Sequence, residues 1–137
     1  MRRVLNWTWL MKDGEKKMTY QDMKKSLMML EEPVEKLELV MDFGKMLEQI
    51  PIGADCNEIV GCSSFVQICR KDGRFFASAD SAIVRGIVAL FLAMVDGKNY
   101  LEIKSMDLES EFNSLNLNLG ASRLNGVNSM IRFFKNL

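Results

Sequence analysis

The longest apolar run of the chain extends from Ala82 to Val95 and constrains the fold more than any other feature of the sequence. Arg85 is its single charged residue, Asp80 just before it is a suitable helix N-cap, and Gly97 just after it is a suitable C-terminal stop. At roughly 15 residues the run is shorter than the ~20 residues that a membrane-spanning helix needs. We therefore expect a helix buried at the centre of a folded domain, covered by a short antiparallel sheet, and no membrane span.

The segment before this helix has the pattern of a β-hairpin. Side chains alternate in period two from Ser63 to Cys69, which predicts a strand. Asp72-Gly73 follows, and Asp-Gly between apolar runs is the strongest short signal for a hairpin turn. Arg74 to Ala77 should then be the returning strand. The stretch from Pro51 to Gly61 is rich in turn-forming residues and is expected to be a loop.

Two helices are expected on the N-terminal side of the hairpin. Thr19 followed by Asp22 resembles a capping box, so the first helix should run from about Tyr20 to Leu30. Pro33 is tolerated in the first turn of a helix, and apolar residues recur at helical spacing after it until Pro51 stops the pattern. The charged residues of this second helix either form a solvated face or dock a basic partner.

Three helices are expected in all from residue 100 onward. Two are short, at Tyr100 to Ser105 and at Leu108 to Leu115, and the last follows Ser122 as its N-cap. The last helix should pack inward through four apolar residues, Val127, Met130, Ile131 and Phe134. Helices packed against a small antiparallel sheet make this an α+β fold.

The length of 137 residues fits one domain. Residues 1–17 are basic, and their short apolar stretch is interrupted by Asn6 and Thr8 and lacks the small-residue cleavage site of a secretory signal. We expect either a basic, loosely ordered N-terminal arm or an upstream start codon with the working protein beginning near Met18. A single domain should occupy residues 18–137, and the expected location is cytoplasmic.

Composition excludes several classes of function. The chain has no histidine, which rules out His-based metal sites and histidine-activated nucleophiles. Its 18 basic and 18 acidic residues balance, and it lacks the basic stripe that nucleic-acid binding needs. Cys56, Cys62 and Cys69 lack the paired Cys-x-x-Cys spacing of a zinc or redox site, so we expect no metal site. We predict three free thiols in a reducing compartment.

Cys62 is the candidate reactive group. It follows Gly61, which can adopt backbone angles closed to other residues, and it precedes the predicted strand, so a rigid element would position its thiol on a loop. The alternative is a small buried hydrophobe, because cysteine is among the most buried residue types. The pattern alone leaves both interpretations open.

Three separate motifs resemble those of the SufE family of sulfur acceptors, and their order and spacing fit as well. They are Gly61-Cys62-x-Ser64-x-Val66, Asp80-x-Ala82-Ile83-Val84-Arg85-Gly86 at the start of the apolar helix, and Ser122-Arg123-x-Asn125-Gly126-x-x-x-Met130-Ile131 at the start of the last helix. With the helix before Pro51 included, the resemblance extends from about Lys24 to the C-terminus.

The resemblance implies a sulfur relay for iron–sulfur cluster assembly. A pyridoxal-phosphate cysteine desulfurase, SufS-like or CsdA-like, forms a persulfide on its own cysteine, the acceptor cysteine attacks the outer sulfur, and the sulfur passes to a SufB-like scaffold. The acceptor stimulates the desulfurase and carries no pyridoxal phosphate or metal itself. The implied fold is α+β, with a small antiparallel sheet of about three strands, and is similar to that of the IscU scaffold.

The resemblance also implies roles for individual residues. Cys62 becomes the persulfide acceptor on a loop supported by Gly61 and Ser64, and Asp80 and Arg123 become positions that support the site or bind the partner. Because a cation in the first turn of a helix opposes the macrodipole, Arg123 is expected to reach toward the Cys62 loop or across to the desulfurase.

Three residues at two places depart from the family pattern. Gln67 stands where a tryptophan is common, and Ala77 and Ser78 stand where a Gly-Asp pair is common. Neither would perform the transfer, so the departures concern local packing and partner contacts. Two other functions remain as alternatives: a stand-alone thiol redox enzyme, and a non-catalytic binding module in which Cys62 is structural.

Overall fold

Helix α4 (Ala82–Val95) lies at the centre of the fold, as the apolar run predicts. The computed structural model describes residues 18–137, and the expected arm of residues 1–17 lies outside the described residues. Every residue of α4 from Gly86 to Phe91 is buried, so neighbouring elements surround the helix at its middle. Within the described part of the chain, no helix is both long enough and apolar enough to cross a membrane.

The N-cap of α4 is Ser81 and not Asp80, which corrects the expectation from the sequence. Ser81 Oγ accepts a hydrogen bond from the backbone N–H of Val84 at 3.4 Å. The backbone N–H of Asp80 donates instead to the carbonyl of Phe65 at 3.1 Å, which extends the strand pairing by one residue. Ser81 is therefore the first residue that can act as the cap.

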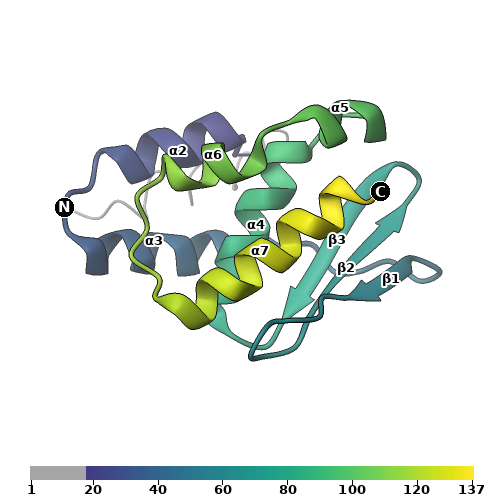
Figure 1. The fold of residues 1–137 in the computed structure, drawn as a ribbon, viewed down its shortest axis with the longest axis horizontal. Coiled ribbons are helices and arrows are strands. Elements are labelled where there is room, and N and C mark those ends of the chain that lie inside the picture. The colour runs from purple at the N-terminus through teal and green to yellow at the C-terminus, as the bar shows by residue number, and fades with distance from the viewer. Residues whose placement is uncertain (1–17) are drawn as a thin grey trace.

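A three-stranded antiparallel sheet of order β1-β2-β3 lies beside α4 (Figure 1). Its strands are β1 (Asp55–Glu58), β2 (Val66–Lys71) and β3 (Arg74–Ala79), and β3 contacts α4. The predicted hairpin turn is confirmed, because Asp72 and Gly73 have φ angles of 53° and 78°, the positive values that a type I′ turn requires.

Strand β1 falls where the sequence predicts a loop. Its four residues, Asp-Cys-Asn-Glu, are all exposed, so the strand lacks the alternation of apolar and polar side chains by which a half-buried strand is recognised. Its backbone pairing with β2, from Asp55 opposite Arg70 to Glu58 opposite Gln67, is what makes it a strand. β1 is therefore a polar edge strand that only tertiary pairing reveals.

The two N-terminal helices are α2 (Tyr20–Met28) and α3 (Pro33–Gly44). The capping box of α2 is confirmed, with hydrogen bonds between Thr19 and Asp22 in both directions. Helix α3 ends at Gly44, well before the predicted stop at Pro51, and successive turn hydrogen bonds follow it, the last from the N–H of Leu47 to the carbonyl of Gly44. Glycine disfavours helix continuation, which explains the early end.

The C-terminal helices are α5 (Tyr100–Ser105), α6 (Leu108–Asn113) and α7 (Ala121–Lys135). Helix α7 begins after Gly120, whose φ is +86°, so Ser122 lies inside the first turn and does not cap it. The predicted inward face of α7 is confirmed, since its four residues are all buried: Val127, Met130, Ile131 and Phe134.

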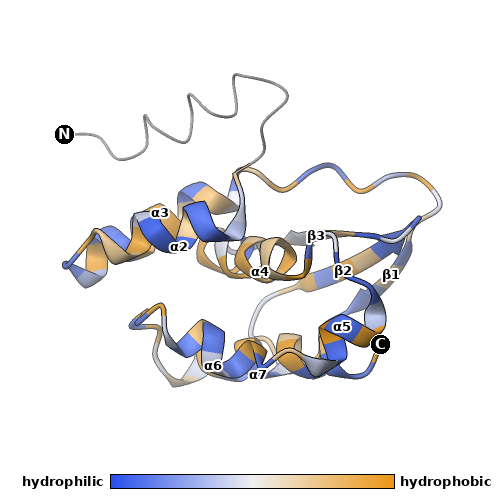
Figure 2. Cartoon of the chain, turned by 90° about the horizontal axis from the view of Figure 1, so that it is seen from above, coloured by the Kyte–Doolittle hydropathy of each residue, from blue (hydrophilic) through white to orange (hydrophobic). Residues whose placement is uncertain are grey.

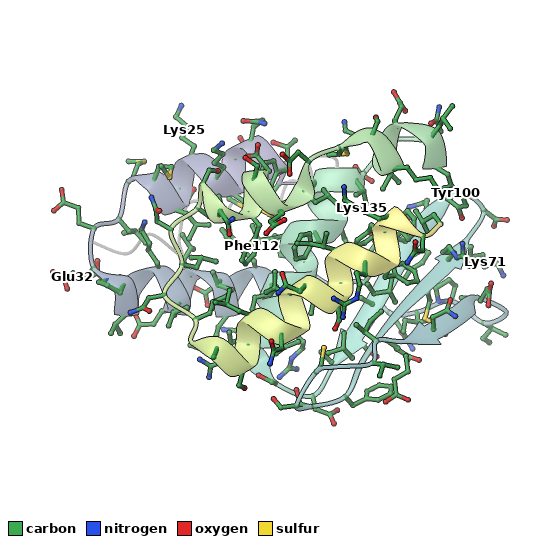
Figure 3. All side chains as sticks on the ribbon, viewed as in Figure 1. Lys25, Glu32, Lys71, Tyr100, Phe112 and Lys135 are labelled. Atoms are coloured by element: carbon green, nitrogen blue, oxygen red, sulfur yellow. A yellow bond between two sulfur atoms is a disulfide. The ribbon has the colours of Figure 1, made fainter. Side chains whose placement is uncertain are left out.

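The aromatic core joins α4 to the C-terminal helices. Phe91 of α4 stacks on Phe112 of α6 with 5.2 Å between ring centroids and lies 6.2 Å from Phe134 of α7. Figure 3 shows Phe112 pointing inward while Lys25 and Glu32 point away from the core. Figure 2 shows the apolar α4 inside, with α5, α6 and α7 along one side. Each such ring pair adds about 0.5–1.5 kcal/mol beyond the area it buries.

Candidate functional site

Cys62 lies on the loop that connects β1 to β2. The N–H of Ile59 donates to the carbonyl of Val66 at 2.8 Å and closes the base of this loop. Both residues are buried, with exposed fractions of 5% and 0%, so they anchor the loop in the core. We define residues 60–65 as the Cys62 loop. The thiol is thus held at the tip of a hairpin, where a rigid sheet positions it.

The Cys62 loop rests on helix α7. Gly61 has a φ of +100°, an angle that side chains disfavour, and a Cβ at this position would collide with Ser129 Oγ. A Cβ on Gly126 would come within 3.1 Å of Cys62 Sγ, so the thiol packs directly on the α7 backbone. Because Gly126 and Ser129 are three residues apart on one helix face, α7 supplies a continuous wall for Gly61 and Cys62.

The Cys62 thiol is half-buried, and this burial raises its pKa above the ordinary value. Taking the thiolate out of water disfavours the charged form. The thiol therefore remains protonated at neutral pH and is a weak nucleophile in the isolated protein. Activation of Cys62 requires a change in its surroundings.

Ser64 and Asp80 are the two remaining predicted site residues on the sheet side of the Cys62 loop. Ser64 is half-buried on the Cys62 loop itself. Asp80 is exposed, and its N–H donates to the carbonyl of Phe65, the last residue of the loop. The structure therefore brings Asp80 next to the loop through its backbone and leaves its carboxylate facing solvent, where a partner can reach it.

Arg123 does not bond to the Cys62 loop, contrary to one of the two expectations for it. Its Nη1 donates to the carbonyl of Leu119 at 3.4 Å, in the segment that precedes α7. The cation that reaches the wall beneath the loop is Arg132, whose Nη2 donates to Ser129 Oγ at 3.0 Å. Sequence reasoning missed Ser129 and Arg132. The helical spacing of Ser129 from Gly126 was the available signal.

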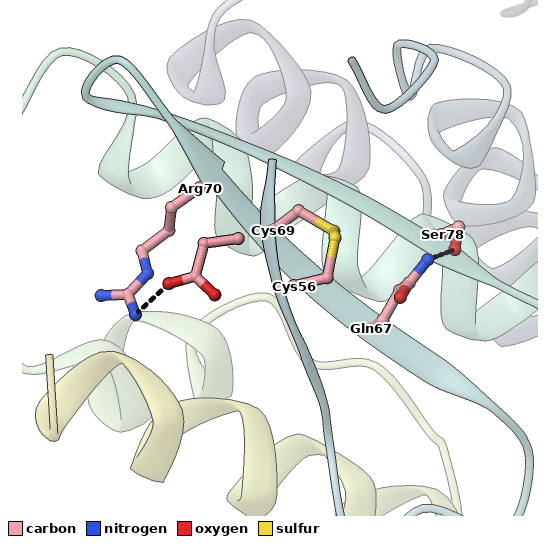
Figure 4. Close-up of a disulfide and its surroundings, with 6 residues drawn as sticks. Cys56, Gln67, Cys69, Arg70 and Ser78 are labelled. Carbon is pink, nitrogen blue, oxygen red and sulfur yellow. Dashed lines mark hydrogen bonds and ion pairs between the residues drawn. A yellow bond between two sulfur atoms is a disulfide. The ribbon is translucent and has the colours of Figure 1, made fainter. Parts of the chain in front are cut away.

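Cys56 and Cys69 form a disulfide between β1 and β2, which corrects the prediction of three free thiols (Figure 4). The two residues are directly opposite one another in the register of the two strands. Because β1 has no periodic pattern in the sequence, this pairing of Cys56 with Cys69 could not be predicted. Of the three cysteines, only Cys62 remains a free thiol.

Two of the three residues that depart from the family pattern, Gln67 and Ser78, lie opposite each other on β2 and β3. Gln67 is the register partner of Ser78, and its Nε2 donates to Ser78 Oγ at 3.1 Å (Figure 4). A side-chain pair of this kind stabilises neighbouring strands. Gln67 and Ser78 thus form a polar pair, while Ala77, the third departing residue, lies opposite Ile68.

Exposed apolar side chains lie at both ends of the Cys62 loop and near the start of α7, the helix on which the loop packs. Val60 and Phe65 at the two ends of the Cys62 loop are 82% and 40% exposed, and Leu124, in the first turns of α7, is 42% exposed. We call these three residues the apolar rim. Large apolar side chains exposed beside a potential reactive group are typical of a protein–protein contact.

Two other kinds of site give no competing candidate. Within the described residues, no group of three or more histidine, cysteine, aspartate or glutamate residues could hold a metal ion. A cavity of about 390 Å³ lies between α2, the segment after α3, the start of β3 and the second half of α4, and its lining includes Met23, Met46 and Phe76. None of the predicted site residues lines this cavity. The candidate site is the surface around the Cys62 loop.

Comparison with known proteins gives consistent matches over most of the chain. The SufE family model, described as an Fe-S metabolism associated domain, matches residues 21–137. An uncharacterized SufE-like protein of Rhizobium meliloti (strain 1021) is 33% identical over 118 residues, which cover 77% of this chain and 84% of that protein.

Two relatives carry functional names. The sulfur acceptor protein CsdE of Escherichia coli (strain K12) is 33% identical over 102 residues, 68% of this chain and 69% of that protein. The cysteine desulfuration protein SufE of Wigglesworthia glossinidia brevipalpis is 28% identical over 110 residues, 74% of this chain and 76% of that protein.

Proposed function

This chain belongs to the SufE family, and from that premise we propose that it accepts sulfur from a cysteine desulfurase on Cys62. The observation that carries the assignment is the state of the cysteines. Cys62 is the free thiol of the three, and it stands at the tip of a hairpin beside the apolar rim. The relatives named sulfur acceptor and cysteine desulfuration protein support the same chemistry.

The transfer is a thiol–persulfide exchange. The Cys62 thiolate attacks the outer sulfur of a persulfide on the desulfurase, a new S–S bond forms at Cys62, and the desulfurase cysteine leaves as a thiolate. One proton is lost from the Cys62 thiol and one is taken up at the leaving sulfur, so no external oxidant or reductant is needed. Pyridoxal phosphate belongs to the desulfurase, which generates the persulfide.

Docking supplies the activation that the isolated protein lacks. Burial raises the pKa of Cys62, so its thiolate is scarce at neutral pH. The apolar rim gives the desulfurase a surface to bind, and the exposed Asp80 and Arg123 lie on elements that flank it. Contact at this surface would bring groups of the desulfurase to the Cys62 thiol, with the loop still on α7, and these groups would favour the thiolate. The acceptor thereby draws sulfur from the desulfurase and stimulates its turnover.

Persulfide on Cys62 then passes by a second exchange to a cysteine of a SufB-like iron–sulfur scaffold. This makes the chain an accessory carrier. A stand-alone thiol redox enzyme with a resolving cysteine fits less well, because Cys56 and Cys69 are already bonded to each other.

Sulfur loading measured by mass tests the proposal. The protein is mixed with a SufS-like or CsdA-like desulfurase and cysteine, and intact mass with peptide mapping should show a gain of about 32 Da on the peptide of Cys62, the mass of one sulfur gained by exchange. Cys62→Ser should abolish this gain and the stimulation of the desulfurase. A Cys56→Ala/Cys69→Ala double variant is the control and should still be loaded. Normal loading of Cys62→Ser would refute the assignment.

A further inference from the structure

We propose that Ser129 and Arg132 are positioning residues for Cys62: Arg132 fixes the Ser129 hydroxyl, and the hydroxyl holds the Cys62 loop in a sheltered resting position. The inference rests on the proposed function of Cys62 for its biological meaning. The claim that two residues of α7 control the reactivity of the Cys62 thiol rests on contacts within this chain.

Ser129 is the one buried polar side chain among the described residues, with 6% of its surface exposed. Its Oγ donates to the carbonyl of Asn125 at 3.1 Å and accepts from Arg132 Nη2 at 3.0 Å. Buried hydroxyls need such partners, and here the two bonds leave the hydroxyl a single orientation. Ser129 therefore presents a fixed oxygen to whatever packs on this face of α7.

Gly61 packs on that oxygen. Its missing side chain leaves the space that Ser129 Oγ occupies, since a Cβ there would collide with the hydroxyl. One turn earlier on α7, Gly126 provides the surface that contacts Cys62 Sγ. The loop is thus held at two consecutive residues, and a shift of Ser129 would loosen the contact at Gly61, the residue directly before Cys62.

Arg132 is exposed, and its guanidinium donates a hydrogen bond to Ser129 Oγ. The bond is charge-assisted and so is stronger than one between neutral groups. It reaches along the helix from position 132 to position 129, which are neighbours on the helix surface. Arg132 therefore acts on Cys62 through Ser129 and not by touching the sulfur.

The arrangement accounts for a half-buried, protonated thiol in the resting protein. Holding Gly61 against α7 keeps Cys62 packed on Gly126, where water reaches the sulfur poorly. Loosening the loop would hydrate the thiol, favour the thiolate and make it more reactive toward small electrophiles. The same loosening would reduce the fraction of molecules with the loop correctly placed for a desulfurase.

The test measures alkylation of Cys62 by iodoacetamide across pH, in protein with the Cys56–Cys69 disulfide intact. Ser129→Ala and Arg132→Ala should each increase the rate at neutral pH by at least about threefold, and the midpoint of the rate–pH profile should fall. Sulfur acceptance from a desulfurase should slow by a similar factor. The Ser129→Ala/Arg132→Ala double variant should match Ser129→Ala alone, because the two residues act as one unit.

Matched controls separate positioning from loss of stability. Ser114→Ala removes a helix hydroxyl that bonds the carbonyl of Glu111 away from the site, and Lys135→Ala removes an exposed cation in the last turn of α7. Both should keep the wild-type alkylation rate and midpoint. Melting temperatures of all variants are measured alongside.

Wild-type alkylation profiles in both Ser129→Ala and Arg132→Ala would overturn the proposal. Additive effects in the double variant would overturn the claim that Arg132 acts through Ser129. Alkylation needs no desulfurase, so this result is independent of the loading test on Cys62→Ser. A failure of the proposed function and a failure of the positioning role would therefore appear in different experiments.

Discussion

At the scale of single residues, the surroundings of one sulfur atom decide what the chain can do. Cys62 has no histidine to activate it anywhere in the sequence, and burial raises its pKa. The resting protein is thus built to keep its thiol inert. Such a state protects a persulfide carrier from oxidation, because the thiolate is the form that oxidants attack.

The pH dependence of Cys62 reactivity follows from this burial. In the native protein, the rate of alkylation should rise with pH around a midpoint higher than that of the same cysteine in urea-unfolded protein, because folding favours the protonated thiol. Rates are measured by mass spectrometry from neutral to alkaline pH, with Cys62→Ser as the unlabelled control. A native midpoint at or below the unfolded one would contradict the expectation.

Gly61 should tolerate no side chain. Alanine there meets both a φ of +100° and the Ser129 hydroxyl, whereas Gly97→Ala meets a φ of +77° with open space around it. The left-handed backbone alone costs roughly 1–2 kcal/mol. Urea unfolding should therefore show a larger loss of stability for Gly61→Ala than for Gly97→Ala. Equal losses would show that the contact with Ser129 is unimportant.

At the scale of secondary-structure elements, the sequence predicts those helices and turns that depend on residues close together in the chain. The apolar run of α4, the capping box of α2 and the Asp72-Gly73 turn are set by neighbours in the sequence, and each prediction is confirmed. Strand β1 is set by its pairing with β2 and carries no periodic signal, so it was missed together with its disulfide.

Site prediction was limited in the same way. Motif resemblance predicted a site at Gly61 and Cys62, and their loop packs on α7. Ser129 occupies an unspecified position of the third motif and Arg132 follows that motif directly, and neither could be singled out because the loop that packs on Ser129 is distant in sequence. The N-cap of α4 was missed by one residue, where β3 pairing extends to Asp80, and that of α7 by two residues, where Gly120 with its positive φ takes the cap position.

The β1–β2 disulfide should stabilise the edge of the sheet. For a cross-link between residues 13 apart, restriction of the unfolded chain contributes about 3 kcal/mol. Reductant should therefore lower the free energy of unfolding of the wild type and leave that of the Cys56→Ala/Cys69→Ala variant unchanged. Urea titrations with and without reductant measure both. An unaffected wild type would mean that the cross-link contributes no stability.

At the scale of the whole molecule, one carboxylate joins the first described helix to the C-terminal half. Glu111 of α6 accepts hydrogen bonds from Lys24 Nζ at 2.8 Å and from Tyr20 Oη at 2.5 Å, both on α2. The hydrogen bond from Lys24, followed by that from Tyr20, lowers the pKa of Glu111. The negative charge of Glu111 thus helps to hold α6 against α2.

Stability should consequently depend on acid pH through Glu111. Its folded-state pKa lies below the ordinary 4.5, so its stabilisation is present above that value and is lost as the pH falls through the folded-state pKa. Glu111→Gln should flatten this part of the stability–pH curve, while Glu109→Gln, on the exposed face of the same helix, should not. The free energy of unfolding of the wild type and both variants is measured by urea titration from neutral pH to about pH 3. Identical curves for wild type and Glu111→Gln would contradict the prediction.

The contact of Cys62 with Gly126 also bears on how the protein is made. Strand β2 and the Cys62 loop leave the ribosome well before α7, the last of the described helices, and a domain generally folds as a unit. Until α7 has emerged, the wall that shelters the sulfur does not exist. A chain that still lacks α7 therefore carries an exposed thiol, and only a chain that includes α7 can keep the thiol sheltered until a partner binds.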